Sequence, residues 1–202
     1  MPRSGALHCL TFCFLFIGCS PAIEGSISPA FIDSVRDDER RIFVTALTYF
    51  SVADFEGVSG ADALCRASAA SAGLQREYQA LLSTSSLAMK SRLNSGASVY
   101  KVSASQERVR VAERDTDLLE ATTNNLLAPP NFTAQGDVIV GVCAVWTGST
   151  SVGEHHGLSC TNWSNGDSFN LARVGSCTST SAVLNQSSSS CDLANRLYCI
   201  SM

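Results

Sequence analysis

The cysteines constrain this sequence more than any other feature, because six of the nine lie downstream of residue 60. They are Cys65, Cys143, Cys160, Cys177, Cys191 and Cys199. In an oxidising compartment an even number of cysteines forms a disulfide framework, whereas in a reducing one they are more often metal ligands or catalytic thiols. Six cysteines allow fifteen pairings, and spacing alone does not choose among them. The compartment therefore decides how this chain is held together.

The amino-terminal residues indicate export. An apolar stretch from Ala6 to Ile17 follows Arg3, which gives the basic start and the roughly 7–15 apolar residues of a secretory signal. The stretch is too short to span a membrane, since a transmembrane helix needs about 20 such residues. We therefore expect residues 1–18 to be a signal peptide and the six downstream cysteines to form three disulfides.

The end of this stretch, Phe16-Ile17-Gly18-Cys19, resembles the lipobox of bacterial lipoproteins, in which the cysteine is acylated and becomes the first mature residue. Phe16 departs from the leucine that most bacteria place there. Buried methylenes contribute about 0.8 kcal/mol each and stable anchoring takes about two acyl chains, so an acylated Cys19 would hold the protein on a membrane. Ser20 lacks the acidic character associated with retention in the inner membrane. It therefore favours the outer membrane, and we expect a cell-surface protein. The alternative is simple secretion, with cleavage near Ser20-Pro21-Ala22.

Composition and charge suit one folded domain after this signal. Hydrophobic residues make up 45% of the chain and charged residues 16%, and the net charge is −4. An acidic chain argues against nucleic-acid binding, which usually requires a clustered basic face. Residues 19–41 begin with small, polar and proline residues and end in charges, which predicts a flexible tether. Residues 42–202 are then the folded domain.

Hydrophobic periodicity predicts an α+β domain. Ser59 as N-cap, Asp62 in a capping box and Gly73 after the last turn delimit a helix from Ser59 to Leu74, whose apolar face includes Cys65. Alternating β-branched and aromatic residues predict a first strand within residues 41–50. The remaining elements are expected as strands within 78–83, 99–111, 138–146 and 191–200, a short helix at 85–93 and a loop over 115–137.

Four separated blocks carry a resemblance to known proteins: IFVTALTY, GVSGADALCRASAASAGLQREYQALLS, VWTGSTSVGEHHGLSCTNWSNG and SCDLANRLYCI. In order and spacing they resemble the bacterial endostatin-like family, best known from the leptospiral endostatin-like outer-membrane lipoproteins, and endostatin itself, a collagen domain. The resemblance covers about residues 41–202, although residues 100–138 depart from it. It implies a C-type-lectin-like topology, in which the first and last strands meet and the loops carry the variation.

The resemblance also implies which cysteines pair. Endostatin joins its first cysteine to its last and its middle two to each other, which maps onto Cys65 with Cys199 and Cys160 with Cys191. Cys143 and Cys177 are then left to form an additional bridge. A bridge from Cys65 to Cys199 would close most of the domain into one loop, for which chain entropy gives the larger stabilisation.

No recognisable catalytic motif is present, so we expect a non-enzymatic protein without a cofactor. Glu154, His155 and His156 beside Cys160 form the one cluster that could hold a metal, but neighbouring loop side chains diverge and the cysteine is expected to be oxidised. Calcium-dependent lectins use Glu-Pro-Asn and Trp-Asn-Asp motifs, which PPNF and NWSNGD do not reproduce. We expect no metal site. Trp146 and Trp163 are predicted to be core residues that support long loops.

Cationic side chains concentrate in one stretch of this acidic chain. Between Cys65 and Asp115 there are eight lysines and arginines and only three acidic residues, an excess of five positive charges. Gathered on one face, they would attract sulfated glycosaminoglycan or an acidic host protein. The alternative is that they are solvated side chains on separate faces. The candidates for ligand binding are Lys90, Arg92, Lys101, Arg108, Arg110 and Arg114.

The expected function is that of a non-enzymatic adhesin on a bacterial surface. The resemblance implies binding to host extracellular matrix, with laminin and fibronectin as ligands, and extends to complement factor H and plasminogen. Two alternatives are a structural lipoprotein that faces the periplasm without a host ligand and a calcium-dependent carbohydrate-binding module. Family resemblance leaves the ligand open, because function resides in sites that vary among proteins of one fold.

Overall fold

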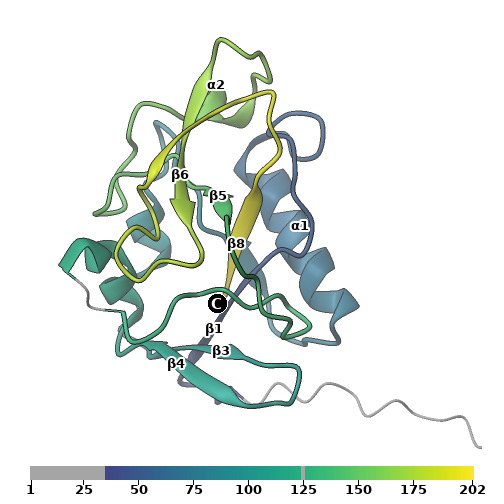
Figure 1. The fold of residues 1–202 in the computed structure, drawn as a ribbon, viewed down its shortest axis with the longest axis vertical. Helices are drawn as coiled ribbons and strands as arrows, with labels where there is room; N and C mark the ends of the chain where they lie inside the picture. The colour runs from purple at the N-terminus through teal and green to yellow at the C-terminus, as the bar shows by residue number, and fades with distance from the viewer. Residues whose placement is uncertain (1–34, 124–125) are drawn as a thin grey trace, which may run out of the picture.

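A computed structural model describes residues 35–123 and 126–202, so the predicted signal peptide, Cys19 and most of the predicted tether lie outside the described residues. The fold is mixed α+β, as predicted (Figure 1). Its strands are β1 (Arg40–Val44), β2 (Tyr78–Ala80), β3 (Val99–Val102), β4 (Arg108–Ala112), β5 (Ala144–Trp146), β6 (Leu171–Ser176), β7 (Ser187–Ser190) and β8 (Arg196–Ser201). Its helical elements are α1 (Gly57–Ser71), η1 (Met89–Arg92), η2 (Asp115–Thr123) and α2 (Cys160–Trp163).

The first and last strands of the described chain meet at the centre of one eight-stranded sheet. Its order is β4-β3-β1-β8-β5-β6-β7, and β2 also pairs with β8. β1 and β8 run antiparallel, with Phe43 opposite Cys199. On the other edge of β8, β5 pairs with its start and β2 with its end. β8 therefore ties together segments from the whole length of the domain.

β1 begins and ends earlier than the sequence predicts. It starts at Arg40 and ends at Val44, so the last two residues of the predicted tether belong to the sheet. Both are buried, and both are held by one residue of β8: Arg40 Nε donates to the Ser201 carbonyl, and Arg41 N donates to the Ser201 hydroxyl. The strand ends at Val44, opposite Tyr198 of β8, and Leu47 beyond it is 67% exposed.

Helix α1 also departs from its predicted ends. It begins at Gly57 after Glu56, whose side chain makes no capping hydrogen bond, and it ends at Ser71. Asp62 does not complete a capping box with Ser59, because it accepts hydrogen bonds from Ala80 N at 2.7 Å and Arg92 Nη1 at 2.5 Å. The predicted apolar face is confirmed, since α1 packs against β2 and β8. Its buried residues are Ala61, Cys65 and Ala69.

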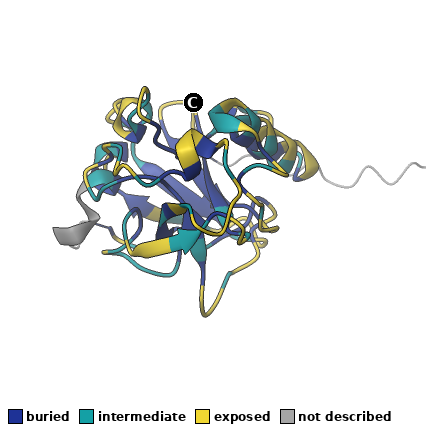
Figure 2. Cartoon of the chain, turned by 90° about the horizontal axis from the view of Figure 1, so that it is seen from above, coloured by how far each residue is buried: buried dark blue, intermediate teal, exposed yellow. Residues whose placement is uncertain are grey.

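Two cores lie on opposite faces of the central sheet. Successive β-strand side chains point to opposite faces, and in β1 Phe43 belongs to the core beneath α1 whereas Ile42 and Val44 belong to the other. Trp146 and Trp163 are fully buried in the first core, which confirms that prediction. Figure 2 shows the buried strands at the centre and the exposed outer side of α1 and the loops around them.

Three disulfides fix the two cores, and their pairs are those that the resemblance implies. Cys65–Cys199 joins α1 to β8 across 134 residues of chain. Cys160–Cys191 joins α2 to the segment after β7, and Cys143–Cys177 joins the residue before β5 to the residue after β6. All six cysteines are buried. Removal of a loop-closing bridge between distant residues typically costs about 2–5 kcal/mol.

Several predicted elements were wrong in type or length. The strand predicted at 99–111 is the hairpin of β3 and β4, and those predicted at 78–83 and 191–200 are β2 (Tyr78–Ala80) and β8 (Arg196–Ser201). Residues 115–123, predicted as loop, form the 3₁₀ helix η2. The predicted helix at 85–93 shrinks to the 3₁₀ turn η1. The predicted strand at 138–146 shrinks to Ala144–Trp146, with Val140 79% and Val142 100% exposed. Alternation of apolar residues predicts a strand only where a neighbouring strand accepts it, and β6 pairs with residues 144–146 alone.

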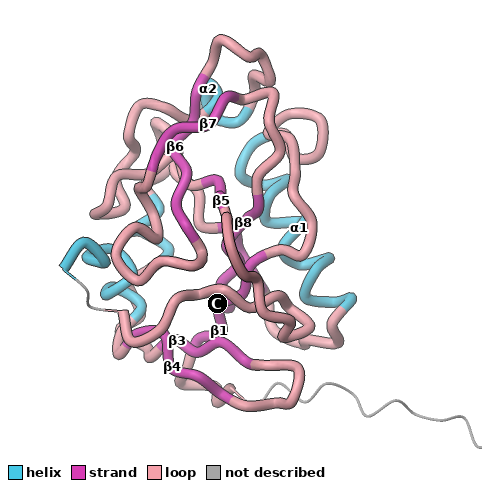
Figure 3. Tube along the Cα trace, in the orientation of Figure 1, coloured by secondary structure: helices cyan, strands magenta, loops and turns pink. Residues whose placement is uncertain are grey.

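The end of the molecule around α2 and β7 consists largely of loops (Figure 3). We call residues 84–86, 154–171 and 185–195 the loop end. Along the longest axis it lies opposite β3 and β4, and the described chain begins beside those strands, where Val35 packs with Tyr100 and Val102 (Figure 1). The loop end therefore lies at the opposite end of the longest axis from Val35, where the described chain begins.

Candidate functional site

The six cations predicted to bind a ligand do not form one free surface. Lys101 is the clearest case, because it is 5% exposed and its Nζ donates to the Pro129 carbonyl at 2.8 Å and to Asn131 Oδ1 at 2.7 Å. The ammonium also lies 4.3 Å from the centre of the Phe132 ring. Burial lowers the pKa of this amine. Lys101 holds the 129–132 segment against β3 and is not available to an external ligand.

Two predicted ligand-binding arginines stack on one tyrosine. The Arg108 guanidinium lies 4.3 Å from the Tyr100 ring centre and pairs with the buried carboxylate of Glu39. Arg110 Nη2 donates to the Tyr100 hydroxyl at 2.7 Å and its Nη1 to Glu113 at 2.8 Å. The hydrogen bond that Arg110 donates to Tyr100, followed by the one that it donates to Glu113, raises the pKa of Arg110. Both arginines therefore make contacts within the protein that stabilise the β3–β4 hairpin.

The other three candidates also have acidic partners. Arg92 and Asp62 form two hydrogen bonds and are largely buried. Lys90 pairs with Glu154, and Arg114 pairs with Asp117 at 2.9 Å, with 66% of the arginine side chain exposed. An exposed pair of this kind contributes about 0–1 kcal/mol. The excess of positive charge in the sequence is thus offset by acids from other segments.

One buried ion pair was missed by sequence reasoning. Arg40 Nη1 lies 2.9 Å from Asp115 Oδ2, and the side chains are 7% and 0% exposed. Burial by itself would raise the pKa of Asp115, but hydrogen bonds from Ser95, Arg40 and the Gly96 amide outweigh it and the pKa is lowered. The two residues are 75 positions apart, so no local pattern could have connected them. The pair joins β1 to the start of η2.

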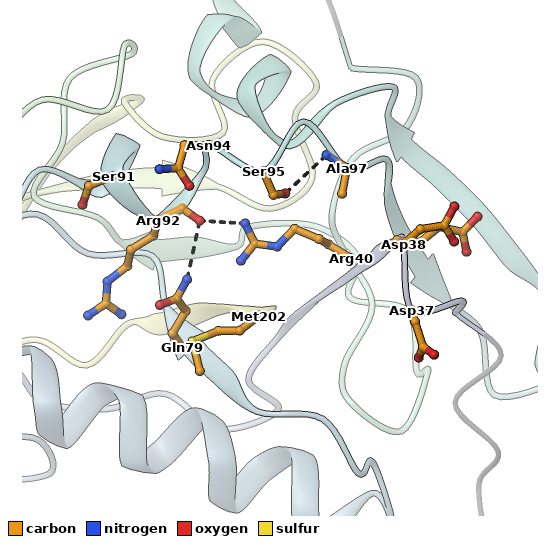
Figure 4. Close-up of a pocket in the computed structure, with 11 residues that line it drawn as sticks. Asp37, Asp38, Arg40, Gln79, Ser91, Arg92, Asn94, Ser95, Ala97 and Met202 are labelled. Carbon is orange, nitrogen blue, oxygen red and sulfur yellow. Dashed lines mark hydrogen bonds between the residues drawn. The ribbon is translucent and has the colours of Figure 1, made fainter.

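A cavity with a volume of about 550 Å³ lies next to this pair. In Figure 4 the Arg40 guanidinium points toward the backbone of Arg92, whose carbonyl accepts from Arg40 at 2.7 Å and from Gln79 at 3.5 Å. Asp37 and Asp38 stand on the other side of the cavity and the Arg92 guanidinium turns away from Arg40. The cavity is on the side where the described chain begins, and its charged lining is already paired in large part.

The loop end contains the most unusual backbone of the described residues. Cys160, Thr161, Asn162 and Trp163 have φ angles of 50°, 54°, 59° and 66°. They form one turn of left-handed helix, labelled α2, in which Trp163 N donates to the Ser159 carbonyl at 2.7 Å. A left-handed conformation costs non-glycine residues about 1–2 kcal/mol each. Strain of this kind persists only where the surroundings fix it, and it clusters at functional sites.

Contacts on every side hold this turn. The Trp163 indole donates to the Ser83 carbonyl at 3.0 Å, and its ring centre lies 5.8 Å from that of Trp146. Asn162 Oδ1 accepts from Ser85 N at 2.8 Å. The Ser159 hydroxyl accepts from Asn162 N at 3.2 Å and lies 3.0 Å from His155 Nε2. The Cys160–Cys191 disulfide supplies the covalent restraint.

The turn forms one wall of a pocket of about 350 Å³, which we call the loop-end pocket. Its lining residues are Ser85, His155, Gly157, Leu158, Ser159, Thr161, Asn162, Phe169, Asn170 and Leu171. None is lysine, arginine, aspartate or glutamate. Sequence reasoning missed this pocket because its residues come from three separate loop segments. The only sequence signal was an apolar Phe169 in a serine- and asparagine-rich stretch.

The side chains of Glu154, His155, His156 and Cys160 do not come together as a set of metal ligands. Among the described residues, no group of three or more His, Cys, Asp or Glu side chains could hold a metal ion. Cys160 is bonded to Cys191, and Glu154 pairs with Lys90. Burial, followed by Arg173 and His155, lowers the pKa of His156. The segment therefore presents hydroxyl, amide and imidazole groups in place of a metal centre.

No protein-family model matches the chain, and no curated protein matches it significantly. Within residues 35–123 and 126–202, none of the helices has the length and apolar character needed to cross a membrane.

Proposed function

We propose that this protein is a lipid-anchored, non-enzymatic adhesin of the outer membrane, with an endostatin-like domain of C-type-lectin-like topology. Its proposed ligands are laminin and fibronectin of the host matrix, with complement factor H and plasminogen as further candidates. Central pairing of β1 with β8 and the Cys65–Cys199 link support the endostatin-like topology. Cys19 would carry the acyl anchor.

The position of the loop end carries this proposal. The described chain begins beside β3 and β4, and the loop end lies at the opposite end of the longest axis (Figure 1). We infer that an amino-terminal anchor would leave the loop end directed away from the membrane. The loop end is rigid, since a disulfide, two buried tryptophans and a hydrogen-bonded turn hold it. A preorganised surface loses little conformational entropy on binding. We therefore assign matrix recognition to the loop end and not to the cationic stretch.

A matched pair of serine variants tests this assignment. Ser168→Arg places a long charged side chain at the loop end, and Ser105→Arg places the same side chain in the β3–β4 turn; both serines are exposed. We expect the first to abolish binding to immobilised laminin or fibronectin and the second to leave it unchanged. Equal effects of the two variants would contradict the assignment. Absence of binding by the wild-type protein to both ligands would refute the proposed matrix recognition.

Labelling of intact cells tests the localisation. A membrane-impermeant reagent should label the domain, and mass spectrometry should find acyl groups on Cys19. An acylated but unlabelled protein, protected from external protease, would support the alternative of a structural lipoprotein that faces the periplasm.

A further inference from the structure

We propose that the loop-end pocket binds a neutral sugar residue of a glycan and does so without calcium. This inference rests on the proposed function, because it names the ligand class for the same face of the molecule. Binding pockets for small ligands generally have volumes of about 300–1,000 Å³ and combine an apolar wall with a few polar groups. The loop-end pocket, at about 350 Å³, has the size for one or two sugar rings.

The charge of the lining favours an uncharged ligand. The pocket has no lysine or arginine to receive a sulfate or carboxylate, and no aspartate or glutamate to receive a cation or to coordinate calcium. Its polar groups are hydroxyls, side-chain amides and the His155 imidazole. These groups donate and accept hydrogen bonds in the same way as sugar hydroxyls do. A sulfated glycosaminoglycan would find no counter-charge there.

Two of these polar side chains are available to a ligand. Within the part of the chain that the structure describes, neither the Thr161 hydroxyl nor the Asn170 side-chain amide has a hydrogen-bond partner. Asn162, by contrast, uses both ends of its amide on Ser85. Asn162 therefore positions the wall, whereas Thr161 and Asn170 can bond a sugar hydroxyl.

An apolar surface stands beside these groups. Phe169 is 96% exposed and Leu171 is 42% exposed, and with Leu158 they supply the apolar part of the lining. Transfer of apolar surface out of water is favourable, so a ligand that covers the Phe169 ring gains binding free energy. The C–H face of a pyranose ring can cover Phe169 while its hydroxyls reach Thr161 and Asn170. An amphipathic ligand of this type satisfies both kinds of group.

A glycan panel tests the inference directly. The purified domain, with its disulfides intact, is assayed against galactose, mannose, N-acetylglucosamine and fucose conjugates, and against sialylated and sulfated counterparts. We expect binding to at least one neutral conjugate that persists in EDTA. Phe169→Ala should raise the Kd about tenfold, since a good aromatic contact is worth up to about 1.5 kcal/mol. Asn170→Ala should raise it about fivefold through the loss of a neutral hydrogen bond.

Phe50→Ala is the matched control, because Phe50 is 44% exposed and does not line the loop-end pocket. An unchanged Kd in Phe169→Ala, a loss of binding in EDTA, or binding to charged conjugates alone would each overturn the inference. Enzymatically deglycosylated laminin and fibronectin separate it from the proposed function. Undiminished binding to the deglycosylated proteins, blocked by Ser168→Arg, would refute the sugar site and leave the adhesin proposal standing. Binding to free neutral glycans by a protein that binds neither laminin nor fibronectin would support the sugar site and refute the proposed matrix recognition.

Discussion

Two regions of this molecule use polar residues in opposite ways. The charged region, residues 35–41 and 90–117, has many ionised side chains, and acids and cations from distant segments pair there across β1, β3 and β4. The loop end has no lysine or arginine, and beside the short strand β7 it is held by a left-handed turn and the Cys160–Cys191 disulfide. In the charged region the ionised side chains pair with one another inside the protein, whereas in the loop end neutral polar side chains remain available to a ligand. A concentration of charge in a sequence is therefore a poor guide to a binding surface.

Removal of the central disulfide should have the largest effect on stability. In the double variant Cys65→Ala/Cys199→Ala the unfolded chain is no longer closed over 134 residues, which corresponds to about 5 kcal/mol in the chain-entropy estimate. We expect this loss in the free energy of unfolding measured by urea denaturation.

The double variant Cys160→Ala/Cys191→Ala opens a loop that spans 31 residues. Its free energy of unfolding should fall by about 4 kcal/mol, and it should also lose matrix binding. Full matrix binding by this second variant would show that the loop end holds its shape without the disulfide.

Asp115→Ala should be nearly as damaging. It leaves the Arg40 guanidinium buried without its carboxylate, and removal of one partner of a buried pair costs about 3–5 kcal/mol. Urea denaturation at pH 7 measures this loss. Glu107→Ala is the control, because Glu107 is exposed and has no ion pair with any residue that the structure describes, and its effect should stay within about 0.5 kcal/mol. Similar losses in the two variants would mean that the buried pair does not stabilise the charged region.

The same carboxylate predicts how stability depends on pH. Burial would raise the pKa of Asp115, but the hydrogen bonds from Ser95, Arg40 and Gly96 hold it below its usual value in the folded protein. Its contribution is present in full above the unfolded pKa of about 4 and is lost as the pH falls through the lower folded pKa. Asp115→Asn should therefore lose less stability than wild type between pH 5 and pH 2 in urea denaturation, and parallel losses would contradict this account.

A smaller loss is expected at the left-handed turn. Asn162→Ala removes both hydrogen bonds to Ser85 and replaces a residue type that tolerates positive φ, which should cost about 1–2 kcal/mol. Matrix binding should weaken at the same time, because the wall of the loop-end pocket moves. Asn94→Ala is the matched control, since Asn94 is exposed and makes no side-chain hydrogen bond within the described residues. Wild-type stability and binding in Asn162→Ala would remove the turn from the site.

The smallest effect is expected at the exposed cations. Arg114→Gln breaks a pair in which 66% of the arginine side chain is exposed, so the free energy of unfolding should fall by less than about 1 kcal/mol. Its binding to laminin and fibronectin should equal that of wild type, with little dependence on salt between 50 and 500 mM. A large loss of binding in this variant would support the sequence-based prediction that the cationic stretch binds the ligand.

The sequence by itself determined the α+β class, the central helix and the use of the cysteines. These features depend on local periodicity and on an even number of cysteines downstream of a predicted export signal, which are properties of the sequence alone. The resemblance supplied the disulfide pairs, and the apolar alternation around Phe43 was enough to place the first strand approximately.

Tertiary structure alone decided the lengths of the strands and the location of the candidate site. Val140 and Val142 alternate as a strand would, yet they remain exposed because no strand among residues 35–123 and 126–202 pairs with them. Asp115 pairs with Arg40, 75 positions away, and Asp62 pairs with Arg92, a cation that the sequence assigned to a ligand-binding surface. Thr161, Phe169 and Asn170 come together because the Cys160–Cys191 bridge and buried Trp163 impose a turn that no local propensity favours. Contacts between distant segments, which local patterns do not encode, produced both the loss of one site and the formation of the other.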